Sequence, residues 1–375
     1  MTTDLGKLTL DWKDVKSVYL FGAGFVSNVC KPLFSKIDIH IEGVIDNDVL
    51  KQGQEWNGIK IQAYDSVKNR LEGKKIIVMA ARTAYNSIAT FLSTQGLIEF
   101  RDFCRIGHFL SEWMWDVKGL NCIYHVDMTI TSRCTFNCKN CNMFIPYYNE
   151  HKDFDIEELK NNMDLFFERV DYVAWFGLIG GETLIYTKLK ELIDYLYLHY
   201  SDRFATLTLT TNGTVMPNEA LLKSLKRDNI LVEISDYTKA VDYVQRFTEI
   251  QRAFDDNDVR YEILSSSVWT DFGFPTYPKK YTERQLEEHL KCCRPDWNGL
   301  NSGRFYYCNV SWSAEKSGRF KLEETDSIDL MSIDPIDRKE CRRLVSLSRG
   351  TSSFCKVCGG CGRDNRDYVP VGVQL

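Results

Sequence analysis

The stretch that decides the fold is IYHVDMTITSRCTFNCKNC, residues 123–141. Its first nine residues alternate between polar and apolar side chains, which is the pattern of a β-strand. Three cysteines, Cys134, Cys138 and Cys141, follow in the spacing C-x3-C-x2-C. If strands and helices alternate around this segment, the cysteines lie in a loop at the carboxyl end of a strand, where β/α barrels carry their functional residues.

The cysteines of this loop indicate a metal centre. The 375-residue chain has 13 cysteines, and its first residues, MTTDLGKLTLDW, have neither the basic nor the apolar region of a signal peptide. We therefore expect reduced thiols, which bind metals rather than form disulfides. Structural zinc takes four protein ligands and no fourth is near, whereas three thiolates on a [4Fe–4S] cluster leave one iron open for chemistry.

Strands and helices alternate on both sides of the cysteine loop. After the strand at 123–131, further strands are expected at 172–178, 206–211, 230–235 and 260–264. Helices are expected from 156, with Asp155 as the N-cap and Glu158 three residues later, and at 188–199, 218–226 and 239–254. This order predicts an α/β fold whose centre, residues 120–285, is a partial (β/α)6 barrel.

The first 115 residues predict a separate domain with a parallel sheet. Apolar strands are expected at 16–21, 39–45 and 75–80, and 111–121 is read as a linker. The loop Gly22-x-Gly24-x-x-Ser27 is one glycine short of the dinucleotide fingerprint, although Asp46 follows at the position of a ribose-binding acid. The domain resembles the Rossmann-like domains of enzymes that assemble sugars and surface polysaccharides. Either it binds a nucleotide or nucleotide-sugar, or it has lost its ligand or serves as an interface.

The central region resembles the radical S-adenosylmethionine (SAM) superfamily, which carries the C-x3-C-x2-C loop after the first barrel strand. Later motifs match in the same order. The resemblance implies that Gly180, Gly181 and Glu182 bind the amino group of SAM, and that Thr211, Asn212 and Ser235 lie beside the rest of the cofactor. One position departs from the family, because Asn140 replaces an aromatic residue that packs on adenine. That contact would come from Phe144 or from a backbone group.

The predicted inner face of the barrel is polar. His125, Asp127 and Thr129 alternate with apolar residues along the first strand, and Thr206, Thr208, Thr210, Glu233 and Ser235 do so on later strands. Such a lining predicts a cavity for a polar ligand, unless these groups only bond to one another. Asp236, Tyr237 and Asp271 near later strand ends are candidates for contact with substrate.

Residues 286–375 hold seven of the cysteines and predict a third region. Cys293 and Cys308 flank a predicted hairpin with Gly303 at its turn, and Cys355 and Cys358 follow. Zinc is one interpretation of this spacing. The resemblance implies instead a SPASM/Twitch-type domain with one auxiliary [4Fe–4S] cluster on Cys293, Cys308, Cys355 and Cys358. Cys292 and Cys361 are alternative ligands, Cys341 is structural, and Cys30, Cys104 and Cys122 are buried apolar residues.

The sequence therefore predicts a cytoplasmic enzyme that cleaves SAM reductively and abstracts hydrogen from a C–H bond of a sugar or nucleotide-sugar, giving oxidation or epimerisation. It would need an external one-electron reductant of the flavodoxin or ferredoxin type. The alternatives are an enzyme that modifies ribosomal peptides, and a non-catalytic iron–sulfur or zinc protein. A net charge of −5 without a basic tract excludes nucleic acid as the main partner, and no apolar run predicts a membrane span.

Overall fold

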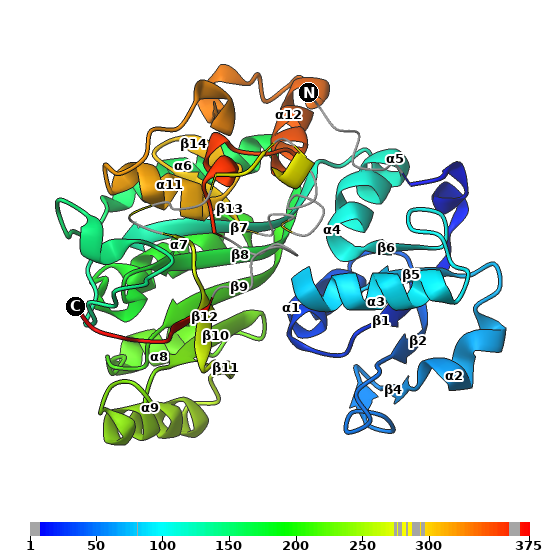
Figure 1. Cartoon of the computed structure of the whole chain (residues 1–375), viewed down its shortest axis with the longest axis horizontal. Helices are drawn as coiled ribbons and strands as arrows, with labels where there is room; N and C mark the ends of the chain where they lie inside the picture. Colours follow the sequence, from blue (N-terminus) through cyan, green and yellow to red (C-terminus); the bar gives the residue numbers. More distant parts are fainter. Residues whose placement is uncertain are drawn as a thin grey trace. The chain divides into compact units, whose positions relative to one another are not determined.

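The computed structural model (Figure 1) describes residues 8–80, 82–273, 276, 280–282, 284–286, 293, 297–359 and 368–375, with the side chains of residues 82 and 83 left out. The chain forms two compact units. The first comprises Met1–Tyr124 with Tyr172–Ala174, and the second comprises His125–Asp171 with Trp175–Leu375. Both are α/β units with parallel strands.

The first unit has a six-stranded sheet in the order β3-β4-β2-β1-β5-β6, and the β1, β2, β4, β5 and β6 neighbours pair in parallel. Its strands are β1 (Ser17–Phe21), β2 (His40–Ile45), β3 (Glu55–Trp56), β4 (Ile59–Gln62), β5 (Lys75–Val78) and β6 (Phe103–Arg105). Its helices are α1 (Phe25–Phe34), α2 (Tyr64–Val67), α3 (Arg82–Thr94), α4 (Ile106–His108) and α5 (Met114–Lys118), with short turns η1 (Leu10–Asp14), η2 (Lys68–Arg70) and η3 (Phe109–Trp113). The parallel strands follow the order 3-2-1-4-5 of a doubly wound sheet.

The prediction of a linker at 111–121 is wrong. The chain there completes η3 and forms α5, which ends at Gly119 in the left-handed conformation with φ 70°. Trp113 and Met114 are buried, so this segment packs like a core helix rather than a linker. The physical reason is its apolar content, which needs a hydrophobic surface to cover it.

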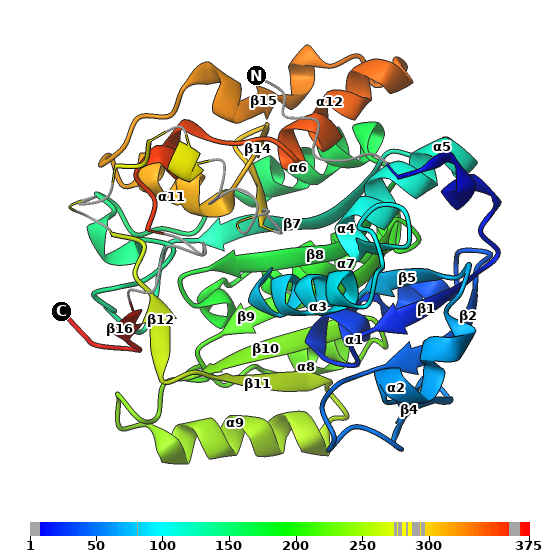
Figure 2. The same ribbon diagram turned by 45° about the vertical axis from the view of Figure 1, so that its right-hand side comes forward.

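The second unit has an eight-stranded sheet in the order β11-β10-β9-β8-β7-β13-β14-β15, and Figure 2 shows β7 to β11 side by side. Its strands are β7 (Cys122–Thr131), β8 (Tyr172–Gly180), β9 (Phe204–Thr211), β10 (Ile230–Asp236), β11 (Tyr261–Ser265), β13 (Asn298–Asn301), β14 (Arg304–Tyr306) and β15 (Ser327–Asp329). A separate ribbon joins β12 (Val268–Thr270) to β16 (Tyr368–Pro370). The five strands expected from the sequence are all present.

Helices follow the parallel strands of the second unit in alternation. They are α6 (Ile156–Arg169), α7 (Leu189–Tyr200), α8 (Glu219–Leu225) and α9 (Val244–Asp256), with α11 (Asn309–Lys316) and α12 (Arg338–Ser348) later in the chain. Short turns complete the unit: η4 (Ile145–Tyr147), η5 (Thr183–Ile185), η6 (Glu324–Asp326), η7 (Leu330–Ser332) and η8 (Ser353–Lys356). The predicted cap is confirmed, since the Asp155 carboxylate accepts hydrogen bonds from the backbone of Glu157 and Glu158. A sixth β/α unit is not found among the described residues.

The described part of residues 286–375 contributes β13, β14 and β15 to this sheet. The predicted hairpin is confirmed as β13 and β14, which pair antiparallel and turn through Ser302 and Gly303, both at positive φ. β13 also pairs in parallel with β7, the strand that precedes the cysteine loop. The region predicted as a third domain therefore lies within the second compact unit, and its independence remains a prediction.

Candidate functional site

The three cysteines of the C-x3-C-x2-C loop lie close together in tight turns after β7. The backbone N–H of Cys141 donates to the Cys138 carbonyl over 3.2 Å, and Phe144 N–H donates to the Cys141 carbonyl over 3.0 Å. Burial and the neighbouring Cys141 thiol raise the pKa of Cys134 to about 12. Burial and Cys138 likewise raise the pKa of Cys141 to about 11, so the three sulfur atoms act on one another.

Polar N–H groups point at two of these sulfur atoms. Cys134 Sγ accepts from the Phe136 backbone at 3.5 Å and from Asn212 Nδ2 at 3.7 Å. Cys138 Sγ lies 3.3 Å from Nε2 of Gln374. No three His, Cys, Asp or Glu side chains in the described ranges stand at the spacing of a single-ion site. Three neighbouring thiols, two of which have N–H groups directed at their sulfurs, nevertheless fit a thiolate-ligated cluster, whose sulfurs take such hydrogen bonds.

The two glycines after β8 allow the backbone to approach the cysteine loop closely. A Cβ atom on Gly180 would lie 2.3 Å from the Thr131 carbonyl oxygen, and one on Gly181 would lie 2.1 Å from that of Arg133. Hydrogen bonds join the same segments, from Gly181 N–H to Thr131 O at 3.0 Å and from Glu182 N–H to Arg133 O at 2.8 Å. The Gly-Gly-Glu segment is therefore fixed to the loop that carries the cysteines.

The Glu182 carboxylate is fully buried and connects the ends of two strands. Its oxygens accept from Thr211 Oγ1 at 2.7 Å, from Asn212 N–H at 2.7 Å and from Leu184 N–H at 3.0 Å. Burial raises the pKa of Glu182, although these hydrogen bonds oppose the shift. In this structure, therefore, the carboxylate positions the end of β9, and its predicted contact with SAM remains a prediction.

The predicted SAM residues of β9 and β10 lie near the cysteine loop. Besides its contact with Cys134, Asn212 Nδ2 donates to Thr135 Oγ1 over 2.9 Å, and the hydroxyls of Thr135 and Thr214 are 2.6 Å apart. Ser235 is half-buried near the end of strand β10, opposite Leu264 of β11. The carboxyl ends of β7, β8 and β9 thus lie together at the cysteine loop.

The structure describes all three candidates for substrate contact. Asp236 accepts a hydrogen bond from Thr238 N–H at 2.9 Å. Burial acts to raise the pKa of Asp236, but this and other hydrogen bonds outweigh burial, so the pKa is lowered. Tyr237 lies near the loop, with its ring tilted against that of Phe136 at a centroid distance of 6.0 Å, and burial followed by the charges of the three cysteines raises its pKa. Asp271 accepts from Gly273 N–H at 2.7 Å.

The backbone at Asp271 packs against a segment that carries a predicted auxiliary ligand. A Cβ on Gly359 would lie 2.1 Å from the Asp271 carbonyl oxygen, and Gly359 N–H donates to Phe272 O over 3.0 Å. This segment therefore packs directly beside Cys358, a predicted auxiliary ligand.

The polar side chains on the inner face of the sheet are buried and largely bonded to one another. His125 Nε2 lies 2.8 Å from Asp127 Oδ1, and Trp175 donates to Thr208 over 2.5 Å. Thr210 Oγ1 donates to Glu233 Oε2 over 3.2 Å, but Glu233 Oε1 has no hydrogen-bond partner among the described residues. Mutual bonding thus accounts for most of the polar set, and Glu233 keeps one free acceptor.

The side chain of Phe144 is not exposed to pack on adenine. Its side chain is 1% exposed and packs edge-on against Phe354, with ring centroids 6.4 Å apart. Phe136, which sequence reasoning did not single out, is half-buried between Tyr237 and Tyr243. The sequence signal that could have identified Phe136 is its position as an aromatic residue two places after Cys134, the first cysteine of the loop.

Two of the predicted auxiliary ligands meet in the structure. Burial raises the pKa of Cys355 to about 12, and the Cys308 thiol adds to the shift. Cys358 is buried in an apolar cluster against which Cys308 packs, and Cys293 is half-buried. Cys292 and Cys361 lie outside the described residues.

The remaining cysteines are buried as the sequence predicts. Cys30, Cys104, Cys122 and Cys341 are all 0% exposed. The Cys341 thiol donates to the carbonyls of Asp334 and Pro335 over 3.5 and 3.7 Å, which is a structural arrangement.

In the first unit, the loop after β1 is closed by its own residues. Asp46 Oδ2 accepts from Ala23 N–H at 2.8 Å and lies 3.3 Å from Lys51 Nζ. Ser27 is buried and donates to the Gly24 carbonyl over 2.7 Å. Whether this loop binds a nucleotide remains a prediction.

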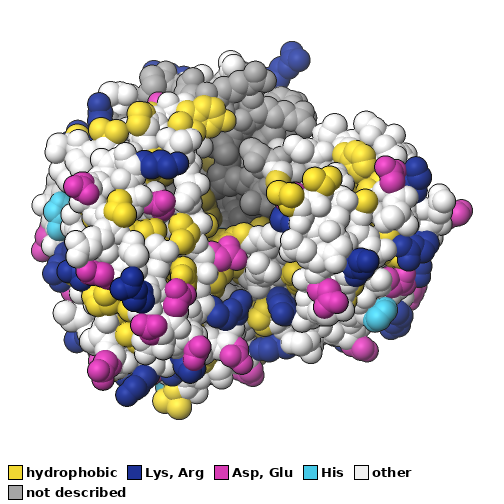
Figure 3. Space-filling model, turned by 90° about the horizontal axis from the view of Figure 1, so that it is seen from below, with side chains coloured by type: hydrophobic (Ala, Val, Ile, Leu, Met, Phe, Trp, Pro, Cys, Tyr) yellow, Lys and Arg dark blue, Asp and Glu magenta, His cyan; other side chains and the backbone are white. Residues whose placement is uncertain are grey.

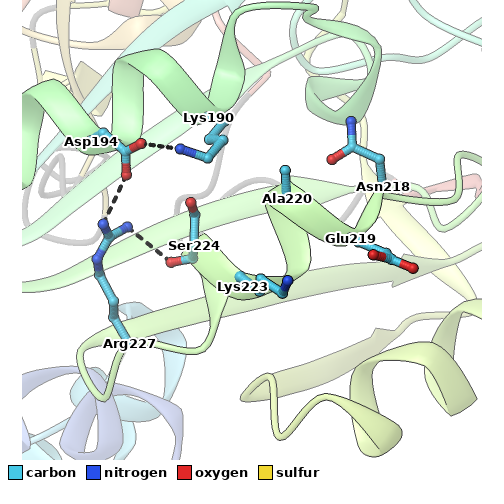
Figure 4. Close-up of a pocket in the computed structure, with 8 residues that line it drawn as sticks. All are labelled: Lys190, Asp194, Asn218, Glu219, Ala220, Lys223, Ser224 and Arg227. Atoms are coloured by element: carbon cyan, nitrogen blue, oxygen red, sulfur yellow. Dashed lines mark hydrogen bonds and ion pairs between the residues drawn. The ribbon is translucent and has the colours of Figure 1, made fainter.

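A hollow between α7 and α8 (Figure 4) contains none of the predicted site residues. Three of its charged groups pair with one another, since Asp194 bridges Lys190 at 2.5 Å and Arg227 at 2.8 Å. On the face shown in Figure 3, basic and acidic side chains are likewise interspersed. None of the helices in the described ranges combines the length and the apolar character that a bilayer crossing requires.

The fold and site define an α/β protein with a three-thiol loop at the end of a strand. Residues 128–291 match the family model described as Radical SAM superfamily, and this part of the chain is a radical SAM domain. The match includes all three loop cysteines and the Gly-Gly-Glu segment.

Curated relatives match over shorter stretches. A GTP 3',8-cyclase of Erythrobacter litoralis is 31% identical over 30% of this chain and 35% of its own length. An S-adenosylmethionine-dependent nucleotide dehydratase of Selenomonas ruminantium is 26% identical over 26% of this chain and 33% of its own. The chain thus spans about a third of the length of these relatives. The solved structure of BtrN with AdoMet and 2-DOIA aligns with 66% of this chain and 97% of its own, at 15% identity and a TM-score of 0.43.

Proposed function

We propose that this chain is a radical SAM enzyme acting on a polar small molecule of the sugar or nucleotide-sugar type. Cys134, Cys138 and Cys141 would hold a [4Fe–4S] cluster whose open iron binds SAM. When bound and reduced by an external one-electron donor, this cluster supplies the electron that cleaves SAM to methionine and a 5'-deoxyadenosyl radical. The observation that carries the proposal is the family match over residues 128–291, which includes the three neighbouring thiols.

The chain's own residues would arrange this site in two ways. The backbone of Gly180 and Gly181 lies against the cysteine loop, where it would bind the amino group of SAM. Glu182 holds Thr211 and Asn212 in place through buried hydrogen bonds, so that the end of β9 can contact the nucleoside part of SAM. Ser235, near the end of β10, is a further predicted contact with SAM.

Two observations support a polar substrate. The inner face of the sheet carries buried polar groups, and Glu233 Oε1 has no hydrogen-bond partner among the described residues. A buried polar atom without a partner is costly, so a polar group of a ligand would satisfy it. In addition, two curated relatives have names that specify nucleotide substrates.

The reaction would end in oxidation or epimerisation. Hydrogen abstraction converts the radical to 5'-deoxyadenosine and leaves a carbon radical on the substrate. Loss of one electron and one proton from that radical gives an oxidised product, whereas transfer of a hydrogen atom from a donor such as a thiol to the opposite face, which leaves a thiyl radical, would give an epimer. A second cluster on Cys293, Cys308, Cys355 and Cys358 would supply an electron acceptor for the first outcome, and the proximity of Cys308 and Cys355 supports it.

The test is deuterium transfer into 5'-deoxyadenosine. The anaerobically reconstituted protein is mixed with SAM, dithionite and one deuterated candidate at a time, drawn from sugars, nucleotide-sugars and peptides. Deuterium in the nucleoside product with a sugar or nucleotide-sugar supports the proposal. Transfer from peptides alone would replace the proposed substrate class, and a zinc-binding protein that forms no 5'-deoxyadenosine would overturn the activity itself.

A further inference from the structure

A segment near residue 375 pairs with the cysteine loop as a short antiparallel strand. Lys139 N–H donates to the Val373 carbonyl over 2.8 Å, and Leu375 N–H donates to the Asn137 carbonyl over 2.9 Å. Between these bonds, Cys138 and Gln374 face each other as a β-bridge. The middle cysteine of the loop is thus flanked on both sides by hydrogen bonds to residues more than 230 positions away in the sequence.

The side chain of Gln374 is held in one orientation beside the Cys138 sulfur. Its Oε1 accepts from Asn137 N–H at 2.7 Å, and its Nε2 donates to the Gly372 carbonyl at 2.6 Å. Because the backbone N–H of Asn137 requires an acceptor, the oxygen of the amide faces that residue and the NH2 group faces Cys138. The second N–H of this group is directed to Cys138 Sγ, 3.3 Å away.

The rest of the segment is anchored to the second unit. β16 pairs with β12, where Trp269 lies opposite Val369. The chain then turns at Gly372, which has φ +68°, and a Cβ at this position would lie 3.1 Å from Ala240 Cβ and 3.3 Å from Tyr237 Cβ. The segment is therefore fixed before it reaches the cysteine loop, and Gln374 is positioned by the fold rather than by a flexible side chain.

We propose that Gln374 is a positioning residue that raises the reduction potential of the cluster held by Cys134, Cys138 and Cys141, an inference that rests on the proposed function. An N–H group directed at a ligating sulfur stabilises the more negative, reduced state of a cluster more than the oxidised state. Since SAM cleavage requires the reduced state, Gln374 would make this state accessible to a biological one-electron donor.

The test compares Gln374→Leu and Gln374→Glu with the wild type and with Val373→Ala. The first variant removes the whole amide, and the second keeps an acceptor for Asn137 but removes the donor to Cys138. Val373 is the matched control, because its exposed side chain can be shortened while its backbone bond to Lys139 remains. Each protein is reconstituted without oxygen, its iron is counted, and its SAM cluster is titrated at defined potentials by electron paramagnetic resonance.

We expect both Gln374 variants to reduce the ratio of reduced to oxidised cluster about tenfold at a given potential, which equals about 59 mV for a one-electron couple. The Val373→Ala protein should titrate like the wild type. An unchanged potential in both Gln374 variants, with normal iron content, would overturn the inference. So would failure of both variants to take up iron while their circular dichroism stays normal, because the segment would then serve assembly.

The same experiment separates this inference from the proposed function. If the wild-type protein binds no cluster through Cys134, Cys138 and Cys141, the proposed function fails. If the wild type holds the cluster and cleaves SAM but the Gln374 variants titrate normally, only the role of Gln374 fails.

Discussion

The buried carboxyl group of Glu233 should make the stability of this protein fall as pH rises. Burial, followed by the nearby charge of Asp127, raises the pKa of Glu233 from its ordinary value of 4.5 to about 8; the hydrogen bond from Thr210 opposes this shift, and the charge of Glu262 adds to it. The folded state then binds more protons than the unfolded state between these two values, so stability is complete below pH 4.5 and is lost up to about pH 8. At 1.36 kcal/mol for each pH unit, the loss is about 5 kcal/mol.

The perturbation is Glu233→Gln, which keeps an oxygen for the hydrogen bond from Thr210 and cannot ionise. The free energy of unfolding is measured in urea by circular dichroism from pH 4.5 to pH 9. The difference in stability between this variant and the wild type should change in favour of the variant by several kcal/mol, up to about 5, across this range. The exposed Glu219→Gln serves as the control and should give a constant difference. Parallel pH curves for Glu233→Gln and the wild type would refute the reasoning.

Three further predictions concern the predicted SAM site and the predicted auxiliary-cluster site. Gly181→Ala places a methyl group against the Arg133 carbonyl. It should reduce SAM cleavage, measured as 5'-deoxyadenosine formation, at least tenfold while the iron content is retained. Normal cleavage would show that this close approach is dispensable. Glu182→Gln sets an NH2 group against the Asn212 N–H and should cost about 1–3 kcal/mol in urea unfolding at pH 7, whereas an unchanged midpoint would contradict the buried bonds. Cys308→Ala should spare SAM cleavage but impair substrate turnover, with about four irons fewer per chain; unaltered iron content would exclude Cys308 as an auxiliary ligand.

The sequence was sufficient to predict the parallel strands β7 to β11 of the second unit and the strands β1, β2 and β5 of the first. Strands with a regular alternation, such as β7, or with a fully apolar run, such as β5, were located to within a few residues. The Asp155 cap and the Gly303 turn were also predictable, because each depends on local chemistry that a few neighbouring residues determine. In contrast, β4 and β6 have four and three residues, too few to show a period.

The features that were missed depend on contacts between distant residues. The segment 111–121 looked like a linker because its buried face is defined only by what packs on it. Gln374 gave no signal at all, since its contact with Cys138 joins residues 236 positions apart and an isolated glutamine has no characteristic spacing. For the same reason, the sequence could assign the Glu182 motif but not the three hydrogen bonds that its carboxylate accepts.

The most direct test of the account is the formation of 5'-deoxyadenosine from SAM and dithionite by three anaerobically reconstituted proteins: wild type, Cys138→Ala and Cys341→Ala. The wild type should bind about eight irons per chain and form the nucleoside. Cys341→Ala, which removes a structural thiol, should do the same, and Cys138→Ala should form none. Continued formation by Cys138→Ala, or zinc in place of iron in the wild type, would contradict the central claim that this loop holds the SAM cluster.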